Sequence, residues 1–256
     1  MPESPTVLTI ERLYGSPSLS GPAPRGVQFS PDGRRVTFLK GRPDEQDRFD
    51  LWQFDVKTGQ QSRLIDSQLV QPVEAELSEM EKATRERKRI AGAKGIVDYD
   101  WGTADMLLVP MGGDLFLVTL GDGAPEVRQL TGNDAFETDA KVSPGGRYAS
   151  FVRDGALYAI DLPSGEETRL SPAAEPDNAV VDLFVQDMAT GETTELKWRK
   201  EEWGPATDQY LARVNWLPDA DLVVQSVDRD QTTLSRTRFT GPDWSPASMG
   251  AETQAC

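Results

Sequence analysis

The chain has 256 residues, of which 38% are hydrophobic, and its 27 basic and 42 acidic residues give a formal net charge of −15. This length can bury a sizeable core, while the acidic balance disfavours nucleic acids and anionic membrane surfaces as partners. The sequence contains no histidine and one cysteine, Cys256. These counts exclude a Ser-His-Asp triad, a histidine-ligated metal and an internal disulfide within this chain. We expect no cofactor and no metal site.

Residues 1–26 are predicted to form a lead-in segment ahead of the first regular strand. Met1–Ile10 lacks a basic region followed by a long apolar run, so it does not predict a secretory signal. No stretch of the chain approaches the roughly 18 apolar residues of a membrane-spanning helix. The compartment of the protein stays open.

One type of predicted hairpin contains a Ser-Pro turn between two apolar runs. Val27–Gly33 (VQFSPDG) continues into Val36–Leu39, and Lys141–Gly146 (KVSPGG) continues into Tyr148–Val152. Proline fixes φ and glycine accepts a positive φ, so the sequence predicts a tight turn between two strands. Looser copies of the same unit span residues 99–109 and 214–224.

A second type of predicted hairpin is repeated along the chain. Each copy starts with an alternating apolar run, crosses a Gly-containing turn and ends in Leu or Ile, which is typical of a β-hairpin with one buried face. The copies span residues 51–65, 115–130, 157–170 and 183–196. Because a hairpin cannot bury its apolar face alone, these units must pack on one another.

Together the two hairpin types predict an all-β chain, a β-propeller of four-stranded antiparallel blades over residues 27–240. The second-type copies start 64, 42 and 26 residues apart, whereas a propeller blade usually takes about 40 to 45 residues. The first interval holds an insertion. The last is too short, which indicates a deletion near residues 171–178. We expect about five blades, two of them incomplete, and a C-terminal tail over 241–256 that completes no blade.

The insertion, residues 73–94, is predicted to contain one charged α-helix. Residues 74–90 lack Gly and Pro and are rich in helix formers. Acidic residues fill the first half and basic residues the second, an order that complements the helix dipole. The apolar stripe is narrow, so we expect a solvated helical arm; a lid or a subunit contact is the alternative.

Candidate catalytic groups are few. No G-x-S-x-G or Walker motif occurs, and no base is evident beside Cys256. Glu166 and Glu167 follow a hairpin turn, where charge on an outer strand is ordinary. Glu201 and Glu202 lie in a connection between blades, where cation binding is the alternative to a solvated role. The sequence therefore predicts no catalytic, substrate-binding or metal-binding residue, and no enzyme from this chain alone.

Several segments resemble the N-terminal propeller of bacterial dipeptidyl peptidase IV, a serine peptidase of the prolyl oligopeptidase type. The resemblance extends over about residues 8–230, and the charged helix is its most specific part. The matching segments are Leu8–Leu13 with Gly15–Leu19, Gln28–Gly33, Glu81–Ile90 with Gly95–Trp101, Gly113–Phe116, Tyr210–Trp216 and Val223–Gln225.

The resemblance implies a parent enzyme that removes N-terminal dipeptides with proline or alanine at the second position. In that family an eight-bladed propeller covers a C-terminal α/β-hydrolase domain, which supplies the Ser-Asp-His triad. Paired glutamates of the propeller bind the α-amino group of the peptide substrate. The resemblance also implies a homodimeric parent, often periplasmic in bacteria.

The sequence departs from this family in ways that limit the inference. The hydrolase domain is absent from these residues, and the segment that would carry the paired glutamates is missing near Glu175. The role is not transferred to Glu201 and Glu202, which stand in the wrong part of the blade order. The interpretation is a truncated, non-catalytic propeller portion of such a peptidase. The alternative is a free-standing propeller-like module that binds proteins or peptides.

Overall fold

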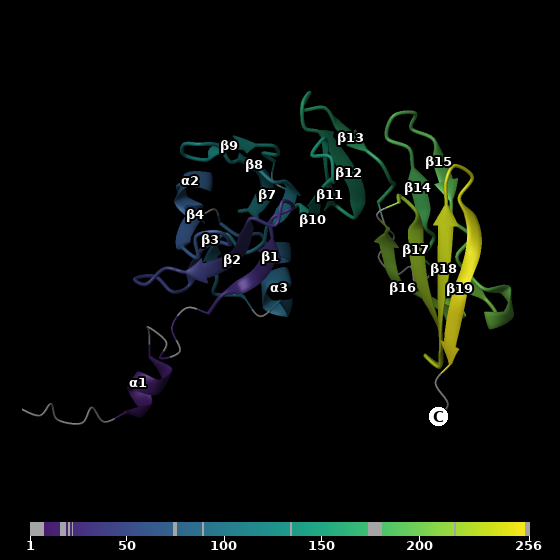
Figure 1. The fold of residues 1–256 in the computed structure, drawn as a ribbon. Helices are drawn as coiled ribbons and strands as arrows, with labels where there is room; N and C mark the ends of the chain where they lie inside the picture. Colours follow the sequence, from purple (N-terminus) through teal and green to yellow (C-terminus); the bar gives the residue numbers. More distant parts are fainter. Residues whose placement is uncertain are drawn as a thin grey trace, which may run out of the picture. The chain divides into compact units, whose positions relative to one another are not determined.

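The structure is a computed structural model that describes residues 8–15, 19, 21, 23–73, 76–88, 90–133, 135–173, 181–217 and 219–253. The chain divides into two compact units, residues 1–174 and 175–256. Each unit is built from sheets whose main strands are antiparallel and follow one another in chain order (Figure 1). None of the described helices is long and apolar enough to cross a membrane.

The N-terminal unit contains three sheets, here called the first, second and third sheet. The first sheet consists of β1 (Arg25–Phe29), β2 (Arg35–Gly41), β3 (Arg48–Asp55) and β4 (Gln61–Ile65), and the short β5 (Lys94–Gly95) pairs in parallel with β3. The second sheet consists of β6 (Asp100–Thr103), β7 (Met106–Met111), β8 (Asp114–Thr119) and β9 (Glu126–Gln129). The third sheet consists of β10 (Thr138–Val142), β11 (Tyr148–Arg153), β12 (Ala156–Asp161) and β13 (Glu167–Arg169).

The C-terminal unit contains the fourth and fifth sheets. The fourth sheet has only two described strands, β14 (Phe184–Gln186) and β15 (Thr193–Glu195). Two short 3-10 helices, η1 (Glu201–Trp203) and η2 (Ala206–Asp208), lead into the fifth sheet. That sheet consists of β16 (Gln209–Trp216), β17 (Leu222–Asp228), β18 (Thr233–Thr240) and β19 (Ser245–Thr253).

The repeated Asp-x-x-x-Gly turns have one physical cause. In the hairpin between β3 and β4, the Asp55 carboxylate accepts a hydrogen bond of 2.7 Å from the Thr58 amide, and Gly59 has a φ of 71°. The turns at Asp161 and Asp187 repeat this arrangement. Because a side-chain carboxylate satisfies the turn amide and glycine tolerates the positive φ, each copy of the motif closes the same hairpin.

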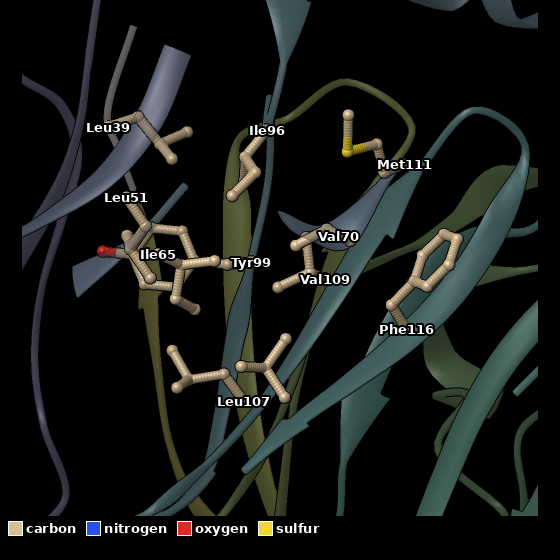
Figure 2. Packing of buried hydrophobic residues seen from close by; sticks show 11 residues of the cluster. Leu39, Leu51, Ile65, Val70, Ile96, Tyr99, Leu107, Val109, Met111 and Phe116 are labelled. Atoms are coloured by element: carbon tan, nitrogen blue, oxygen red, sulfur yellow. The ribbon is translucent and has the colours of Figure 1, made fainter. Parts of the chain in front are cut away.

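The first and second sheets pack face to face around a buried cluster (Figure 2). Leu39 and Leu51 of the first sheet meet Leu107, Val109 and Phe116 of the second. Leu51 and Leu107 are fully buried. Since burial of one such side chain contributes about 1.5–3 kcal/mol, the interface between sheets is a main source of stability.

The face of the second sheet that points away from the first sheet packs against the third sheet. Leu108 and Leu117, which alternate with the residues that face the first sheet, pack with Ala149, Phe151 and Ile160 of the third. The side chains of a strand point alternately to its two faces, so one apolar strand serves two neighbours. In the C-terminal unit, a separate core contains Leu196, Trp198, Leu222, Val224 and Phe239.

The four-stranded antiparallel blades expected from the sequence are confirmed, with one correction at the C-terminal end. All four second-type hairpins are present, and the fourth sheet has two strands among the described residues. The expectation that residues 241–256 complete no blade is wrong. β19 pairs with β18 from Thr233↔Thr253 to Thr240↔Ser245 and makes the fifth sheet four-stranded. The expected deletion near 171–178 falls largely on residues 174–180, outside the described residues.

The inserted helix also differs from its prediction. Helix α3 covers Glu79–Arg87, so residues 76–78 are not helical and the helix is shorter than expected. Its N-cap, Ser78, accepts a hydrogen bond of 3.2 Å from the Glu81 amide, so the helix begins at the next residue, Glu79. The expected solvated arm is wrong, because Glu81 and Arg85 are buried. The remaining helices are α1 (Ile10–Tyr14), in the lead-in segment, and α2 (Ser67–Val70).

Candidate functional site

A groove beside α3 in the N-terminal unit is the best candidate site. Its main cavity, of about 350 Å³, lies between α3, the turn joining β7 to β8 and the loop before β10. A neighbouring cavity of about 250 Å³ shares Lys88, Ile90, Val97, Asp98 and Tyr99 with it. We call these two cavities together the α3 groove. Concave sites with mixed apolar and charged walls are the usual places where proteins hold small ligands or peptides.

Helix α3 forms one wall because a buried ion pair fixes it. The Arg85 guanidinium lies 2.7 Å from the Glu81 carboxylate one turn earlier and donates a hydrogen bond of 2.5 Å to the carbonyl oxygen of Ala93. A buried pair of this kind keeps its charges only if the remaining hydrogen-bonding groups are satisfied. The contact to Ala93 ties the helix to the segment that leads into β5, so the wall is held in place.

The opposite wall carries a buried carboxylate, Glu137. It accepts hydrogen bonds of 3.1 Å from both the Thr131 hydroxyl and the Asn133 amide, and its carboxylate lies 3.4 Å from Nε of Arg153. Burial raises the pKa of Glu137 above its ordinary value, against the hydrogen bonds and Arg153, which lower it. Burial likewise raises the pKa of Asp114, which lies in the same wall. Perturbed carboxyl groups in a cleft are typical of functional sites and also of structural networks.

The contacts of Arg153 favour a structural role for this carboxylate. The guanidinium stacks over the rings of Phe151 and Tyr158, at 5.1 and 4.5 Å from their centroids. It also donates a hydrogen bond of 2.5 Å to Glu167. The arginine thus joins Glu137 to the third sheet. The Glu137 carboxylate therefore holds the groove wall in place through these contacts and is not a free acid.

Tyr99 closes the floor of the groove. Its hydroxyl donates a hydrogen bond of 2.6 Å to the carbonyl oxygen of Gly26 and lies 3.0 Å from the Thr37 hydroxyl, which also accepts from Trp101. Burial raises the pKa of Tyr99 to about 12. The phenol therefore stays protonated near neutral pH and serves as a donor that links the first and second sheets.

The residues singled out from the sequence lie elsewhere. Glu201 and Glu202 are exposed in η1 of the C-terminal unit. Glu166 is exposed beside a hairpin turn, while Glu167 is ion-paired with Arg153 rather than simply solvated. Cys256 and Glu175 fall outside the described residues. Sequence reasoning missed Asp114 and Glu137, because neither belongs to a motif with diagnostic spacing.

The chemistry available in the α3 groove is that of binding. Its lining residues include carboxylates, basic side chains and apolar groups, with no serine, cysteine or histidine among them. Within the described part of the chain, no three acidic or cysteine side chains are placed to hold a metal ion. The groove can therefore hold a ligand by charge and shape.

Comparison with known proteins places these observations in a family context. Residues 171–243 match the family model described as the dipeptidyl peptidase IV (DPP IV) N-terminal region. The fold is similar to that of Porphyromonas gingivalis dipeptidyl peptidase 4, with a TM-score of 0.60 and 12% identity over 90% of this chain and 40% of that chain. It is also similar to oligogalacturonate lyase from Vibrio parahaemolyticus, with a TM-score of 0.58 and 10% identity over 88% of this chain and 64% of that chain.

These comparisons confirm the resemblance to the N-terminal propeller region of dipeptidyl peptidase IV. At such low identities the structural matches show the fold, while the family model adds sequence support over residues 171–243. The chain spans about two fifths of the dipeptidyl peptidase 4 structure and less than two thirds of the lyase structure.

Proposed function

We propose that this chain is the non-catalytic propeller portion of a dipeptidyl peptidase IV-like serine exopeptidase. The observation that carries the proposal is the match of residues 171–243 to the N-terminal region of that family, on a chain built of four-stranded blades. In this proposal an α/β-hydrolase domain supplies the nucleophile, base and oxyanion donors, and the propeller shapes access to them. A peptide with a free N-terminus and proline or alanine at its second position is the proposed substrate of the parent.

The site residues of this chain agree with a supporting role. The α3 groove has two fixed walls, one held by the Arg85–Glu81 pair and the other by the contacts of Glu137. Walls of this kind can exclude bulky substrates without taking part in the chemistry. We assign the family's paired-glutamate anchor to no residue of this chain.

Hydrolysis of Gly-Pro and Ala-Pro p-nitroanilides by the purified chain tests the proposal. We expect no product above background, because the proposed nucleophile, base and oxyanion donors belong to the hydrolase domain and the lining of the α3 groove contains no serine, cysteine or histidine. A dipeptidyl peptidase IV preparation is the positive control for the assay. Product release that persists through repurification and is blocked by a serine-directed inhibitor would overturn the non-catalytic assignment.

A free-standing peptide-binding module is the second candidate, and the volume and fixed walls of the α3 groove favour it. Fluorescence anisotropy with labelled Xaa-Pro peptides separates the two functions. The propeller portion of a peptidase should bind such peptides weakly when alone, with a Kd above about 1 mM, since most contacts would come from the hydrolase. Binding in the micromolar range that is lost in Arg87→Glu, on the groove wall, would favour the module.

A further inference from the structure

A cavity in the C-terminal unit has no part in the proposed function. It has a volume of about 620 Å³, which lies within the usual range of small-molecule sites, and its walls come from the fourth sheet, the turn between β16 and β17 and the turn between β18 and β19. Its described lining residues include two tryptophans and four carboxylates but no lysine or arginine. We call it the tryptophan cavity, and its composition points to a positively charged ligand.

Two tryptophan rings supply the aromatic wall of this cavity. Trp216 is the last residue of β16, and Trp244 lies in the turn between β18 and β19. Their ring centroids are 5.7 Å apart and their planes meet at 75°. Trp244 is half-buried against the core of the unit, so this edge-to-face contact holds the ring of Trp216, which is 59% exposed. The cavity therefore presents a positioned aromatic surface that is open to a ligand.

A second wall carries two carboxylates that a single arginine neutralises only in part. Arg238 lies 2.6 Å from the Asp219 carboxylate and 2.5 Å from that of Asp221. Asp221 also accepts a hydrogen bond of 2.9 Å from the Thr240 hydroxyl. Since one guanidinium serves two carboxylates, this wall keeps a net negative charge.

The turn between β14 and β15 adds two more carboxylates, Asp187 and Glu192. Asp187 accepts hydrogen bonds of 2.9 and 2.7 Å from the amides of Thr190 and Ala189, which hold the pKa of Asp187 below its ordinary value and keep it ionised near neutral pH. Glu192 is exposed, and within the described part of the chain neither carboxylate forms an ion pair with a basic side chain. The charge of this wall is therefore available to a cationic ligand.

We propose that the tryptophan cavity binds a quaternary or methylated ammonium cation, with the cation against the Trp216 ring and its charge balanced by Asp187 and Glu192. Indole is the strongest aromatic acceptor for such cations, because its ring face carries the negative part of the quadrupole. A methylated ammonium group is less strongly hydrated than the compact ammonium of lysine, so it loses less hydration on a partly apolar wall. The net charge of −15 attracts ligands of this sign to the chain as a whole. The proposal goes beyond the proposed peptidase function and does not depend on it.

The same walls disfavour other classes of ligand. An anion would meet an excess of negative charge, since four carboxylates stand against the one guanidinium of Arg238. A neutral apolar ligand could contact both indoles, but it would take water away from Asp187 and Glu192 without replacing it. A cation that carries apolar methyl groups is complementary to the aromatic wall and to the charged walls at once.

Titration of the full chain with choline, at constant ionic strength, tests this proposal. The readout is the indole N–H signals of the six tryptophans in ¹H–¹⁵N NMR spectra, in which the variants Trp216→Phe and Trp244→Phe assign the two signals of the cavity. We expect these two signals to shift together with a Kd of about 1 mM and the other indole signals to stay in place. The alcohol 3,3-dimethylbutan-1-ol has the shape of choline without its charge and should bind about tenfold more weakly, or less.

Two variants locate the site, each with a matched control. Trp216→Leu should lower the affinity for choline about tenfold, whereas Phe184→Leu, at an aromatic residue that is 55% exposed on β14, should bind like the wild type. Glu192→Gln should lower the affinity about threefold, whereas Glu201→Gln, at an exposed residue of η1, should have no effect. The indole signal of Trp198, which is 1% exposed in the core, reports whether each variant is folded. If Trp216→Leu does not fold, Glu192→Gln still decides the test, because it changes only an exposed side chain.

Acetylated and amidated trimethyllysine separates two sources of the cation. A higher affinity than that of choline would assign the ligand to a methylated lysine of a protein, and an equal or lower affinity would assign it to a free small cation. Unmoved Trp216 and Trp244 signals up to about 50 mM choline, far above the expected Kd, would overturn the proposal. Equal affinity for the neutral alcohol, or equal losses in a variant and its control, would overturn it as well.

Discussion

The first and fifth sheets are built on the same plan and differ mainly in the chemistry of one face. Each contains a four-stranded antiparallel meander with one apolar face packed into a core, and the first sheet adds the short parallel strand β5. The other face carries Phe29 and Phe54 in the first sheet and Arg213 and Arg236 in the fifth. The order and direction of the strands therefore do not indicate whether both faces of a sheet are covered. That is indicated by the residues at alternate positions of its strands, which are apolar on a face that packs against another sheet and charged on a face that meets water.

The largest expected change in the free energy of unfolding is the difference between substitutions on the two faces of the first sheet. Leu51→Ala removes a fully buried side chain between two sheets and should lower the free energy of unfolding by about 3 kcal/mol. Phe29→Ala, at a position of the other face that is 68% exposed, should change it by less than about 0.5 kcal/mol. Urea unfolding of both variants at low protein concentration measures the difference. Equal losses would mean that Phe29 is covered within a single chain.

Substitution of Asp50 is expected to give the next largest loss in the free energy of unfolding. This buried carboxylate binds Arg42 at 2.9 Å, Arg63 at 3.3 Å and the Ser67 amide at 2.9 Å. Asp50→Asn should cost about 2–3 kcal/mol, because the arginines lose their buried partner. Arg236→Thr is the counterpart on the open face of the fifth sheet and should have little effect, since exposed ion pairs contribute little.

The effect of Asp50→Asn should also depend on pH. Burial alone would raise the pKa of Asp50, but the hydrogen bonds from Arg42 and Ser67 outweigh burial and hold the pKa below its ordinary value. A carboxyl group with a lowered pKa stabilises the fold above its unfolded-state pKa, and this contribution is lost as the pH falls through the folded-state pKa. The difference between wild type and Asp50→Asn should therefore shrink as the pH is lowered from 6 to 3. A constant difference would contradict the role assigned to the charge.

Exchanging the chemistry of these faces of the first and fifth sheets sharpens the comparison further. Arg213→Val/Arg236→Val makes the central row of the fifth sheet apolar, like that of the first. We expect a rise in fluorescence of the dye ANS, about twofold or less, because the new patch resembles one that already exists. Arg34→Val, at an exposed turn of the first sheet, is the control and should leave the signal unchanged. An unchanged signal in the double variant would show that the face chemistry is not what decides exposure.

The smallest predicted effect concerns Glu137, whose pKa is shifted in the opposite direction to that of Asp50. Burial raises the pKa of Glu137, so the folded state binds a proton more tightly than the unfolded state does. Its ionisation therefore costs stability as the pH rises above its unfolded-state pKa. Glu137→Gln should remove this cost, so that the variant gains stability relative to wild type between pH 4.5 and 7. Urea midpoints measured across that range provide the test, and a relative loss would contradict it.

The strands could be predicted from the sequence because their causes are local. Alternation of apolar residues and the turns at Asp55–Gly59 and Asp161–Gly165 depend on neighbouring residues, and the structure places hairpins at each copy. β19 was missed because Ser245–Thr253 is exposed at every position and has no apolar alternation to reveal a strand. Only its pairing with β18 makes it one.

The candidate site could not be predicted because its contacts are not local. Glu137 is defined by Arg153 and Thr131, and Arg85 by a carbonyl group beyond the end of its helix. The charge pattern of α3 correctly indicated a helix. The spacing of an i,i+4 ion pair such as Glu81–Arg85, however, does not show whether the pair is exposed to water or buried beside a groove. The packing of the surrounding sheets decided between these two outcomes.

The hydroxyl of Tyr99 also bears on how the protein is made. It joins β1 to a residue 73 positions later, and part of the cover over the inner face of the first sheet comes from β7 and β8, which end at Met111 and Thr119. During synthesis, Leu39 and Leu51 therefore lack their packing partners in β7 and β8 until about 50 residues beyond β4 have been made. At about 5–20 residues per second, a ribosome needs roughly 3 to 10 seconds to supply them. For that interval the nascent first sheet is an apolar surface open to chaperones and to neighbouring nascent chains.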